Sequence, residues 1–351
     1  MARFARKRSK AVACLTFFVR NDIIKKNHFV AEAQMKMKSN MVIHPDELSK
    51  RWIDRLADAG IEVLGIHPWG GTKATESLKN LAELVKTDGF RKLIDYAESR
   101  GLEIEYELHA AGYLMPRELF DTHSEYFRMN ADGKRTNDSN FCVSNGEALD
   151  IFARNAAQLA LSLYKSCNRF YFWMDDGHDL GCFCPECQKL SASDRQMLVI
   201  NRMLFEIRKH IPNAQMAYLA YMDTVVPPKN IAPCDGVFLE YAPFEKYTAK
   251  GENARNLIER EKKMIAPLAE YFGNGQKKVL EYWYDNSLFS GWKKPPSKFV
   301  PDVCAMEKDM DEYRKMGFDV VCTFACFLGE DYEELHGDFD ITPFAECAKK
   351  Y

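Results

Sequence analysis

Two adjacent acids and a group of thiols are the residues in this sequence most able to do chemistry. An apolar, aromatic run ends in Asp175 and Asp176, and Cys182, Cys184 and Cys187 follow within a dozen residues. A pair of carboxylates where a buried strand meets solvent can hold a ligand and transfer a proton, since each carboxylate raises the pKa of the other. Three thiols within six residues reach the density of a metal site.

The acid pair also has a purely structural interpretation. Asp-Asp-Gly at a strand end is often a turn whose carboxylates bond to local amides. Two acids repel each other at one exit, however, and a single turn-forming residue would avoid that cost. Neighbouring residues on a strand point in opposite directions, so both acids can serve one ligand only if the backbone turns between them. Gly177, which follows the pair, permits such a turn.

The cysteine group lacks one ligand for a four-coordinate metal. His178 or Cys142, from the loop before the acids, could supply it. Such a site would be closed and structural, because three thiolates leave little Lewis acidity for catalysis. We therefore expect no cofactor to be required for catalysis and a possible structural zinc. The alternative is a set of small buried thiols that pack the loop.

Apolar runs with strand character alternate with helical patterns along most of the chain. The expected strands are 40–45, 61–67, 102–110, 169–175, 215–221, 236–243, 278–284 and 319–325. The expected helices are 46–59, 90–99, 146–165, 193–210, 254–272 and 309–316, with a hairpin at 132–133. We expect Asp46 to cap the first helix, and Ser193 and Gln196 to form a capping box.

Eight strands that alternate with helices predict a (β/α)₈ TIM barrel over residues 40–351. Residues 1–39 are expected to form a short N-terminal appendage. The alternative fold is an open doubly wound sheet, but no glycine-rich phosphate loop follows any strand.

In a parallel barrel the C-terminal ends of all strands lie on one face, where the chemistry takes place. The candidate substrate-binding residues at these ends are His67, Trp69, His109, Trp173, Tyr221, Glu240, Tyr241, Glu281, Tyr282 and Trp283. Aromatic rings with a few acids suit a saccharide, whose ring faces are apolar and whose hydroxyls bond to carboxylates. We expect Tyr106, Phe172 and Phe238 to lie in the core, and His67 and His109 could also be satisfied buried imidazoles.

Composition restricts the partners. The net charge is −3, and the basic residues are scattered rather than clustered, which argues against nucleic acid. No apolar run approaches the length of a membrane span. Eleven cysteines spread over the chain favour a reducing, cytoplasmic compartment over a disulfide framework. A basic start before an apolar run at 11–19 leaves export as the alternative. The expected partner is a glycan or small saccharide.

Several long motifs resemble one family. They are WIDRLADAGIEVLGIHPWGG, YELHA, HSEYFRMNADGKRTNDSNFCVSN, FWMDDGHDLGCFCPECQKLSASDRQ and FLEYAP. Together they are similar to the uncharacterised bacterial domain family 4838. Part of that family is classed with family 163 glycoside hydrolases, which are endo-β-N-acetylglucosaminidases acting on N-glycans. The resemblance covers residues 40 to the C-terminus and implies a (β/α)₈ barrel.

The resemblance implies a retaining mechanism in which the substrate's own N-acetyl carbonyl is the nucleophile. Asp175 would then orient the acetamido group, and Asp176 would be the general acid/base. The Asp-Asp pair is similar to that of family 84, whereas family 20 uses Asp-Glu, so the division of roles is open. Tyr241 or Tyr282 could bond to the acetamido oxygen, with Trp173, Trp283 and Tyr284 as walls of the sugar subsite.

Two other functions fit the same sequence. In the first, Glu240 or Glu281 acts as a distant partner carboxylate for inverting hydrolysis of a uronic-acid-type sugar. Arg117, Arg128 and Arg135 would then face the anionic sugar. In the second, the chain is a non-catalytic barrel that binds glycans.

Overall fold

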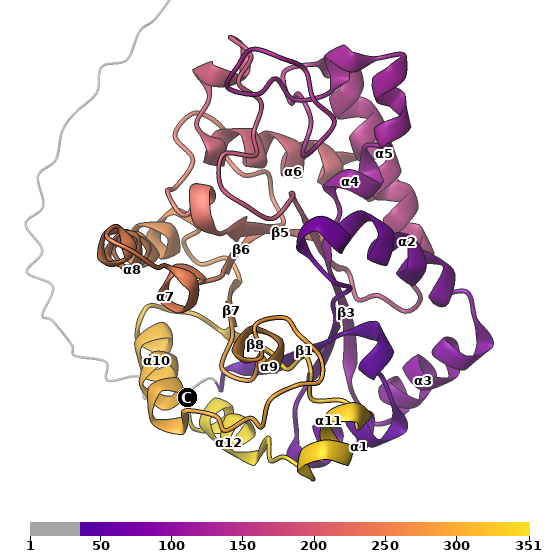
Figure 1. Ribbon diagram of the computed structural model, residues 1–351, viewed down its shortest axis with the longest axis vertical. Helices are drawn as coiled ribbons and strands as arrows, with labels where there is room; N and C mark the ends of the chain where they lie inside the picture. Colours follow the sequence, from indigo (N-terminus) through magenta and orange to yellow (C-terminus); the bar gives the residue numbers. More distant parts are fainter. Residues whose placement is uncertain (1–35) are drawn as a thin grey trace, which may run out of the picture. The chain divides into compact units, whose positions relative to one another are not determined.

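Eight parallel strands close into a barrel in chain order, and β8 pairs with β1. The computed structural model describes residues 36–351. Figure 1 shows the strands at the centre and the helices around them. The strands are β1 (Lys38–Ile43), β2 (Val63–Ile66), β3 (Glu103–His109), β4 (Arg169–Trp173), β5 (Gln215–Ala220), β6 (Val237–Tyr241), β7 (Lys277–Glu281) and β8 (Val320–Phe324). The predicted (β/α)₈ barrel is confirmed.

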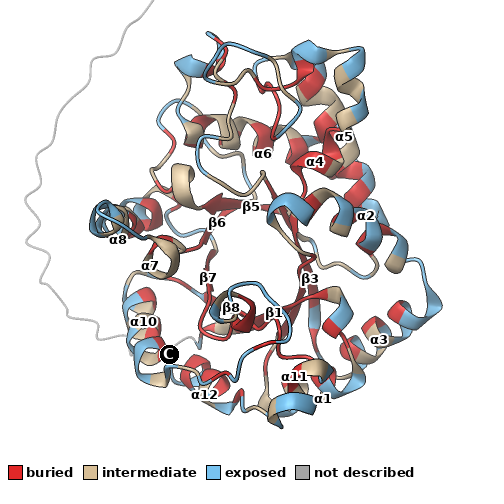
Figure 2. Ribbon diagram, viewed as in Figure 1, coloured by how far each residue is buried: buried red, intermediate tan, exposed pale blue. Residues whose placement is uncertain are grey.

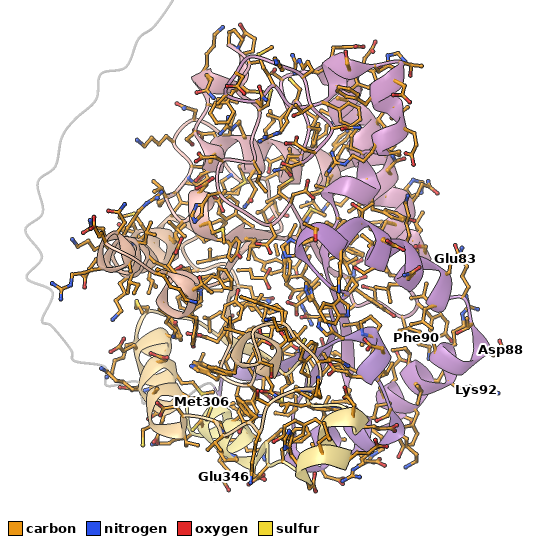
Figure 3. All side chains as sticks on the ribbon, viewed as in Figure 1. Glu83, Asp88, Phe90, Lys92, Met306 and Glu346 are labelled. Carbon is orange, nitrogen blue, oxygen red and sulfur yellow. The ribbon has the colours of Figure 1, made fainter. Side chains whose placement is uncertain are left out.

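Helices connect the strands and cover the barrel from outside. They are α1 (Lys50–Ala59), α2 (Ala74–Leu84), α3 (Asp88–Ser99), α4 (Ala111–Leu114), α5 (Gly146–Ser162), α6 (Ala192–Arg208), α7 (Glu245–Thr248), α8 (Ala254–Tyr271), α9 (Asn286–Phe289), α10 (Val303–Lys315), α11 (Glu330–His336) and α12 (Thr342–Lys350). The longer helices turn an apolar face inward, as on α3, where Phe90 is buried while Asp88 and Lys92 point to solvent (Figure 3).

Two predicted helix starts are wrong. Asp46 lies in a separate 3₁₀ turn (Pro45–Glu47), and the Ser49 side chain caps α1 by accepting a hydrogen bond from the Trp52 amide. At α6 the capping box is formed by Ser191 and Asp194, two residues before the predicted pair. In both cases a second polar residue near the true cap offered an equally good pattern.

The start of the barrel also differs from the predicted boundary. β1 begins at Lys38, so Lys38 and Ser39 belong to the barrel rather than to the expected appendage. Met37, also assigned to the appendage, is buried in the core of the barrel domain. Residues 1–35, which include the basic and apolar segment that left export open, lie outside the described residues. Within residues 36–351, none of the helices combines the length and the apolarity needed to cross a membrane.

The strands separate two apolar layers, because alternate side chains face opposite sides. Figure 2 shows the strands as buried almost throughout. On β4, Phe170 and Phe172 pack against the surrounding helices, whereas Tyr171 and Trp173 fill the barrel interior. The predicted core residues Tyr106, Phe172 and Phe238 are all buried.

A group of charges fills the base of the barrel interior. The Lys278 ammonium of β7 is fully buried and lies 2.6 Å from Glu107, 3.3 Å from Glu105 and 3.2 Å from Glu240. Arg169 holds the other oxygen of Glu105 at 2.6 Å. A buried charge without partners would cost several kcal/mol, so these contacts are what allow charge in the barrel interior.

Candidate active site

A cavity of about 350 Å³ opens at the C-terminal ends of the strands. This volume lies in the range of small-molecule pockets, about 300–1,000 Å³. We call it the aromatic pocket. Its polar and aromatic lining residues are His44, His67, Trp69, Lys73, His109, Trp173, Asp176, Tyr221, Phe244, Tyr282, Asp285, Ser287, Trp292 and Phe324. The wall is therefore built from aromatic rings, imidazoles and two carboxyl groups.

Asp176 presents its carboxyl group to the aromatic pocket. Its Oδ1 accepts a hydrogen bond of 2.7 Å from the Tyr221 hydroxyl, which follows β5. Burial first, and then the nearby Tyr282 and Asp176, raise the pKa of Tyr221 well above its usual value. The phenol therefore keeps its proton and donates a hydrogen bond to Asp176 at any physiological pH. This bond fixes one oxygen of Asp176 beside the walls of the pocket.

Asp175 is held by the loop that follows β3. Its Oδ2 accepts hydrogen bonds from Arg117 Nη2 at 2.9 Å and from the Asn140 amide at 2.6 Å. In return, the Asp175 amide donates to Asn140 Oδ1 at 2.9 Å. We call this set of contacts the Asp175 clasp. It ties the end of β4 to a loop more than thirty residues away in the chain.

The two aspartates do not face the same cavity. Asp176 lines the aromatic pocket, whereas Asp175 lines an adjoining cavity of about 270 Å³, which shares His109, Leu219 and Tyr221 with it. Adjacent residues on an extended chain point in opposite directions, and the bend at Asp176 and Gly177, where the φ of Gly177 is 152°, leaves the two carboxyl groups in different cavities. The predicted convergence of both carboxylates on one sugar is not what this geometry provides.

Three histidines follow consecutive strands along one side of the aromatic pocket. Each donates Nδ1–H to a backbone carbonyl: His44 to His67 at 2.8 Å, His67 to Glu107 at 2.7 Å and His109 to Met174 at 2.9 Å. Burial, followed by the charges of His109 and His44, lowers the pKa of His67 well below its usual value, and burial also lowers the pKa of His44. A neutral ring that donates through Nδ1 keeps Nε2 as a hydrogen-bond acceptor.

Trp173 forms part of the pocket floor, and Glu240 lies beneath it. The Trp173 indole Nε1–H donates to Glu240 Oε2 at 2.8 Å, and Glu240 is fully buried against Lys278. Contrary to the expected position, Glu240 does not line the aromatic pocket, because its carboxylate contacts the Trp173 indole and the interior ion group. Glu240 instead orients the ring that faces the pocket.

Three more predicted substrate contacts face away from the pocket. Tyr241 packs against Tyr313 and Phe318 between the barrel and its helices. Glu281 binds Lys246 at 2.6 Å, Tyr247 at 2.7 Å and Tyr313 at 2.6 Å. On a strand, side chains that face outward alternate with side chains that face the pocket, as Glu281 and Tyr282 do. A residue one position away from a pocket residue therefore faces the opposite side of the sheet.

After Tyr282 the chain leaves the strand and enters a turn, so the alternation ends. Trp283, the third predicted contact that faces away from the pocket, donates to Asp309 at 3.1 Å. Tyr284, suggested as a wall of the sugar subsite, is fully buried and packs against Phe299 and Phe344. Neither ring lines the aromatic pocket.

The arginines expected near an anionic sugar make internal contacts. Arg117 belongs to the Asp175 clasp, and Arg128 pairs with Asp138 at 3.0 Å. Arg135 donates to the Phe127 carbonyl at 2.6 Å and also contacts Cys182. None of the three lines the aromatic pocket, so the structure offers no support for recognition of a uronic acid there.

Sequence reasoning missed Asp285, a second carboxyl group in the aromatic pocket. Its Oδ1 caps α9 by accepting from Ser287 and Leu288, and burial raises its pKa to about 6. His44 and Trp292 were missed as well. A signal was available for His44 and Asp285, since both come directly after an apolar strand, where the other site residues were sought.

The cysteines gather as a group of four. Cys142 joins Cys182, Cys184 and Cys187, with all four sulfur atoms within 4.8 Å of one another and all four residues buried. His178, the other possible fourth ligand, instead contacts Asp223 at 2.8 Å and Glu245 at 2.9 Å. Of the two alternatives, the geometry selects Cys142.

Comparison with known proteins gives a family and a fold. Residues 80–327 match the family described as a domain of unknown function, DUF4838. No curated protein matches the chain. The chain is similar to solved structures of an endo-glycoceramidase II from Rhodococcus sp. (TM-score 0.52, 10% identity, 90% of this chain and 78% of that one). It is also similar to a β-galactosidase from the psychrophilic Marinomonas ef1 (0.52, 12%, 90% and 58%).

A third similar structure is a tri-modular GH5 (subfamily 4) endo-β-1,4-glucanase from Bacillus licheniformis (TM-score 0.51, 11% identity, 91% of this chain and 60% of that one). All three are enzymes that cleave glycosidic bonds. At identities this low, the similarity establishes a common barrel fold.

Proposed function

The chain belongs to the DUF4838 family, and on this basis we propose that it is a glycoside hydrolase acting on glycans that contain β-linked N-acetylhexosamine. One feature of the structure supports the proposal most directly. A carboxyl group, Asp176, is held by Tyr221 inside a ring-walled pocket at the C-terminal mouth of a (β/α)₈ barrel. The fold shared with three glycosidases agrees with this proposal.

The pocket supplies the groups that a hexosamine needs. Aromatic rings such as Trp69 and Trp173 offer flat apolar faces to a sugar ring. The imidazoles of His44 and His67, whose pKa values are lowered by burial, can accept hydrogen bonds from sugar hydroxyls, while the Lys73 ammonium, which also lines the pocket, can only donate. Two carboxyl groups, Asp176 and Asp285, also line the pocket, so it suits a neutral, hydroxyl-rich ligand better than an anionic one.

We assign the proton transfer to Asp176. In the first step the acetamido carbonyl oxygen attacks C1, the glycosidic C–O bond breaks, and Asp176 gives its proton to the leaving oxygen. The product of this step is an oxazolinium ion that keeps its N–H hydrogen. In the second step water attacks C1, the bond between C1 and the oxazolinium ring oxygen breaks, one water proton passes to the Asp176 carboxylate, and the oxazolinium ion reopens to the acetamide. Bonds and protons balance over the two steps, and the anomeric configuration is retained.

A second group must accept the acetamido N–H while the oxazoline forms. The resemblance assigns this role to Asp175, but Asp175 faces the adjoining cavity with its Oδ2 committed to Arg117 and Asn140. Asp285 lines the aromatic pocket and caps α9 through Oδ1 alone, which leaves Oδ2 for a ligand. We therefore assign the N–H contact to Asp285, and we treat Asp175 as a positioning residue that fixes the turn carrying Asp176.

A second candidate mechanism rests on the same observation about Asp285. Two carboxyl groups in one pocket also suit ordinary retaining hydrolysis, in which one acts as acid and the other attacks C1. In that case the substrate needs no N-acetyl group. The two mechanisms differ in what they demand of the sugar at C2, and this difference makes them separable by experiment.

The test is a panel of aryl β-glycosides and a mixed glycan digest, each read by mass spectrometry. We expect release of N-acetylhexosamine-containing products, inhibition by a thiazoline analogue of the oxazoline, and no turnover by Asp176→Asn. Cleavage of sugars without N-acetyl, together with covalent labelling of Asp285 by a 2-fluoro glycoside, would establish the second mechanism instead. Glycan binding without any product would contradict hydrolysis altogether and leave a glycan-binding barrel.

A further inference from the structure

We propose that Cys142, Cys182, Cys184 and Cys187 bind one structural Zn²⁺, which fastens together the two loops that hold Asp175. This inference does not depend on the proposed hydrolysis. Cys142 lies in the loop between β3 and α5, and the other three lie in the loop between β4 and α6. A metal bound by all four would therefore cross-link segments about forty residues apart.

The distances between the sulfur atoms fit a tetrahedral thiolate site. Cys142 Sγ lies 3.6 Å from Cys184 Sγ and 3.9 Å from Cys187 Sγ, and no pair in the group exceeds 4.8 Å. A Zn–S bond of about 2.3 Å in tetrahedral geometry places the sulfur atoms about 3.8 Å apart. The four cysteines are already at the separation that the ion requires.

The surroundings of the sulfur atoms favour thiolates. Cys182 Sγ accepts from the Met129 amide at 3.2 Å and the Cys184 amide at 3.5 Å, and the Arg135 guanidinium lies 3.6 Å away. Backbone N–H groups and a cation directed at ligand sulfur are the contacts that stabilise thiolates around a metal. Packed neutral thiols would need neither.

Three alternatives fit these four thiols less well than a single zinc ion does: a disulfide, a chance grouping of thiols, and an iron–sulfur cluster. None of the four cysteines is in a disulfide. Among residues 36–351, this is the only cluster of His, Cys, Asp and Glu side chains with metal-binding geometry, while the remaining described cysteines are scattered. A multi-iron cluster would hold its four thiolates farther apart than a single ion does, so the compact group selects a mononuclear site. With four protein ligands it has no open position for catalysis.

The site is coupled to the acid pair through neighbouring residues. Cys142 is two positions from Asn140, which makes both reciprocal hydrogen bonds of the Asp175 clasp. On the other loop, the Phe183 amide, next to Cys182, donates to the Met129 carbonyl at 2.8 Å. An ion at the four sulfur atoms would therefore hold both sides of the clasp in place, and with them the turn that presents Asp176.

The direct test is the metal content of the full chain purified without chelator, measured by inductively coupled plasma mass spectrometry. We expect one zinc per chain in the wild type and in Cys347→Ser, a control that removes a buried cysteine outside the group. Cys142→Ser and Cys187→Ser should lose most of the metal. Iron in place of zinc, or wild-type protein that stays metal-free after purification with added zinc, would overturn the proposal.

Cobalt substitution of the wild-type protein tests the same four ligands if the cysteine variants do not fold. The wild-type protein, stripped of metal and loaded with Co²⁺, should show the intense visible bands of tetrahedral cobalt thiolate. A chelator should also lower the melting temperature of the wild type, and added Zn²⁺ should restore it. Cobalt spectra without thiolate bands would contradict the four-cysteine site, whatever the activity of the enzyme.

Discussion

The aromatic pocket and the Asp175 cavity are neighbours that share part of one wall, yet they use an aspartate in opposite ways. In the aromatic pocket, Asp176 has one partner among the described side chains, Tyr221, and stands among rings. In the adjoining cavity, Asp175 is bound by an arginine and a backbone amide, and the loops around it carry the four cysteines. One carboxyl group is presented to a ligand, and the other is used to hold the loop that makes this presentation possible.

A reactive acid can be told from a structural one beside it by its contacts. Both residues are aspartates and they are adjacent in the sequence, so their hydrogen-bond partners are what distinguish them. An arginine and a backbone amide hold Asp175 Oδ2, which ties this carboxylate to the loop after β3. A carboxyl group with a single neutral donor can still exchange a proton with a bound sugar.

The strongest test of this contrast is Asp176→Asn. We expect it to lower kcat by about 10²–10⁴-fold, since the amide accepts the Tyr221 hydrogen bond but cannot give up a proton. Its melting temperature should stay close to that of the wild type. Steady-state kinetics on the best aryl glycoside, paired with thermal denaturation, measures both quantities, and full activity in this variant would contradict the contrast.

Asp175→Ala should show the reverse pattern. The change leaves Arg117 and the Asn140 amide without their acceptor, which we expect to cost about 1–3 kcal/mol of unfolding free energy. Urea denaturation measures this loss, and Asp176→Ala is the matched control. If Asp175→Ala were as stable as the wild type and as inactive as the Asp176 variant, Asp175 would be a catalytic residue and not a positioning one.

The pH dependence of kcat/KM tests the second carboxyl group of the aromatic pocket, Asp285. Burial raises the pKa of Asp285 to about 6, and its ionised form accepts an acetamido N–H more strongly than its protonated form does. We expect kcat/KM to fall about tenfold per pH unit below that value, and this acid limb should be absent in Asp285→Asn. The raised pKa also means that this group's contribution to stability is present below its unfolded pKa of about 3.8 and is lost as the pH rises through 6.

The smallest effect is expected at Tyr221. Tyr221→Phe removes one neutral hydrogen bond to Asp176 and leaves the ring against Phe244. We expect a loss of about 0.5–1.5 kcal/mol, equivalent to a decrease in kcat/KM of at most about tenfold. Loss as large as that of Asp176→Asn would show that Tyr221 itself takes part in proton transfer.

Much of the fold was predictable because each strand and each helix has its own short pattern of apolar and polar residues in the sequence. Each strand is a short apolar run, and closure of the barrel follows once eight are counted. The pocket was predictable only in part. His67, Trp69, His109, Trp173, Asp176, Tyr221 and Tyr282 line it as expected.

The misses have a geometric cause. Glu240 points inward but lies below the pocket floor, while Tyr241, Glu281 and Trp283 point outward. Depth along the barrel axis and the face of each residue depend on the stagger between strands, which no single strand encodes. The Asp175 clasp was hidden for a related reason, since Asn140 and Arg117 reach the acid pair only after a long loop has folded back.

The ion group around Lys278 has a consequence for how the strands find their places. A slip of β7 that puts Val279 in the place of Lys278 would turn the ammonium out among the helices and insert an apolar side chain between Glu105, Glu107 and Glu240. Glu107 and Glu240 would then lose their buried cation, and Glu105 would keep only Arg169 as a cationic partner, which disfavours this register. The buried ion group at the bottom of the barrel thereby favours the native register of β7. The position of Tyr282 at the rim follows from that register.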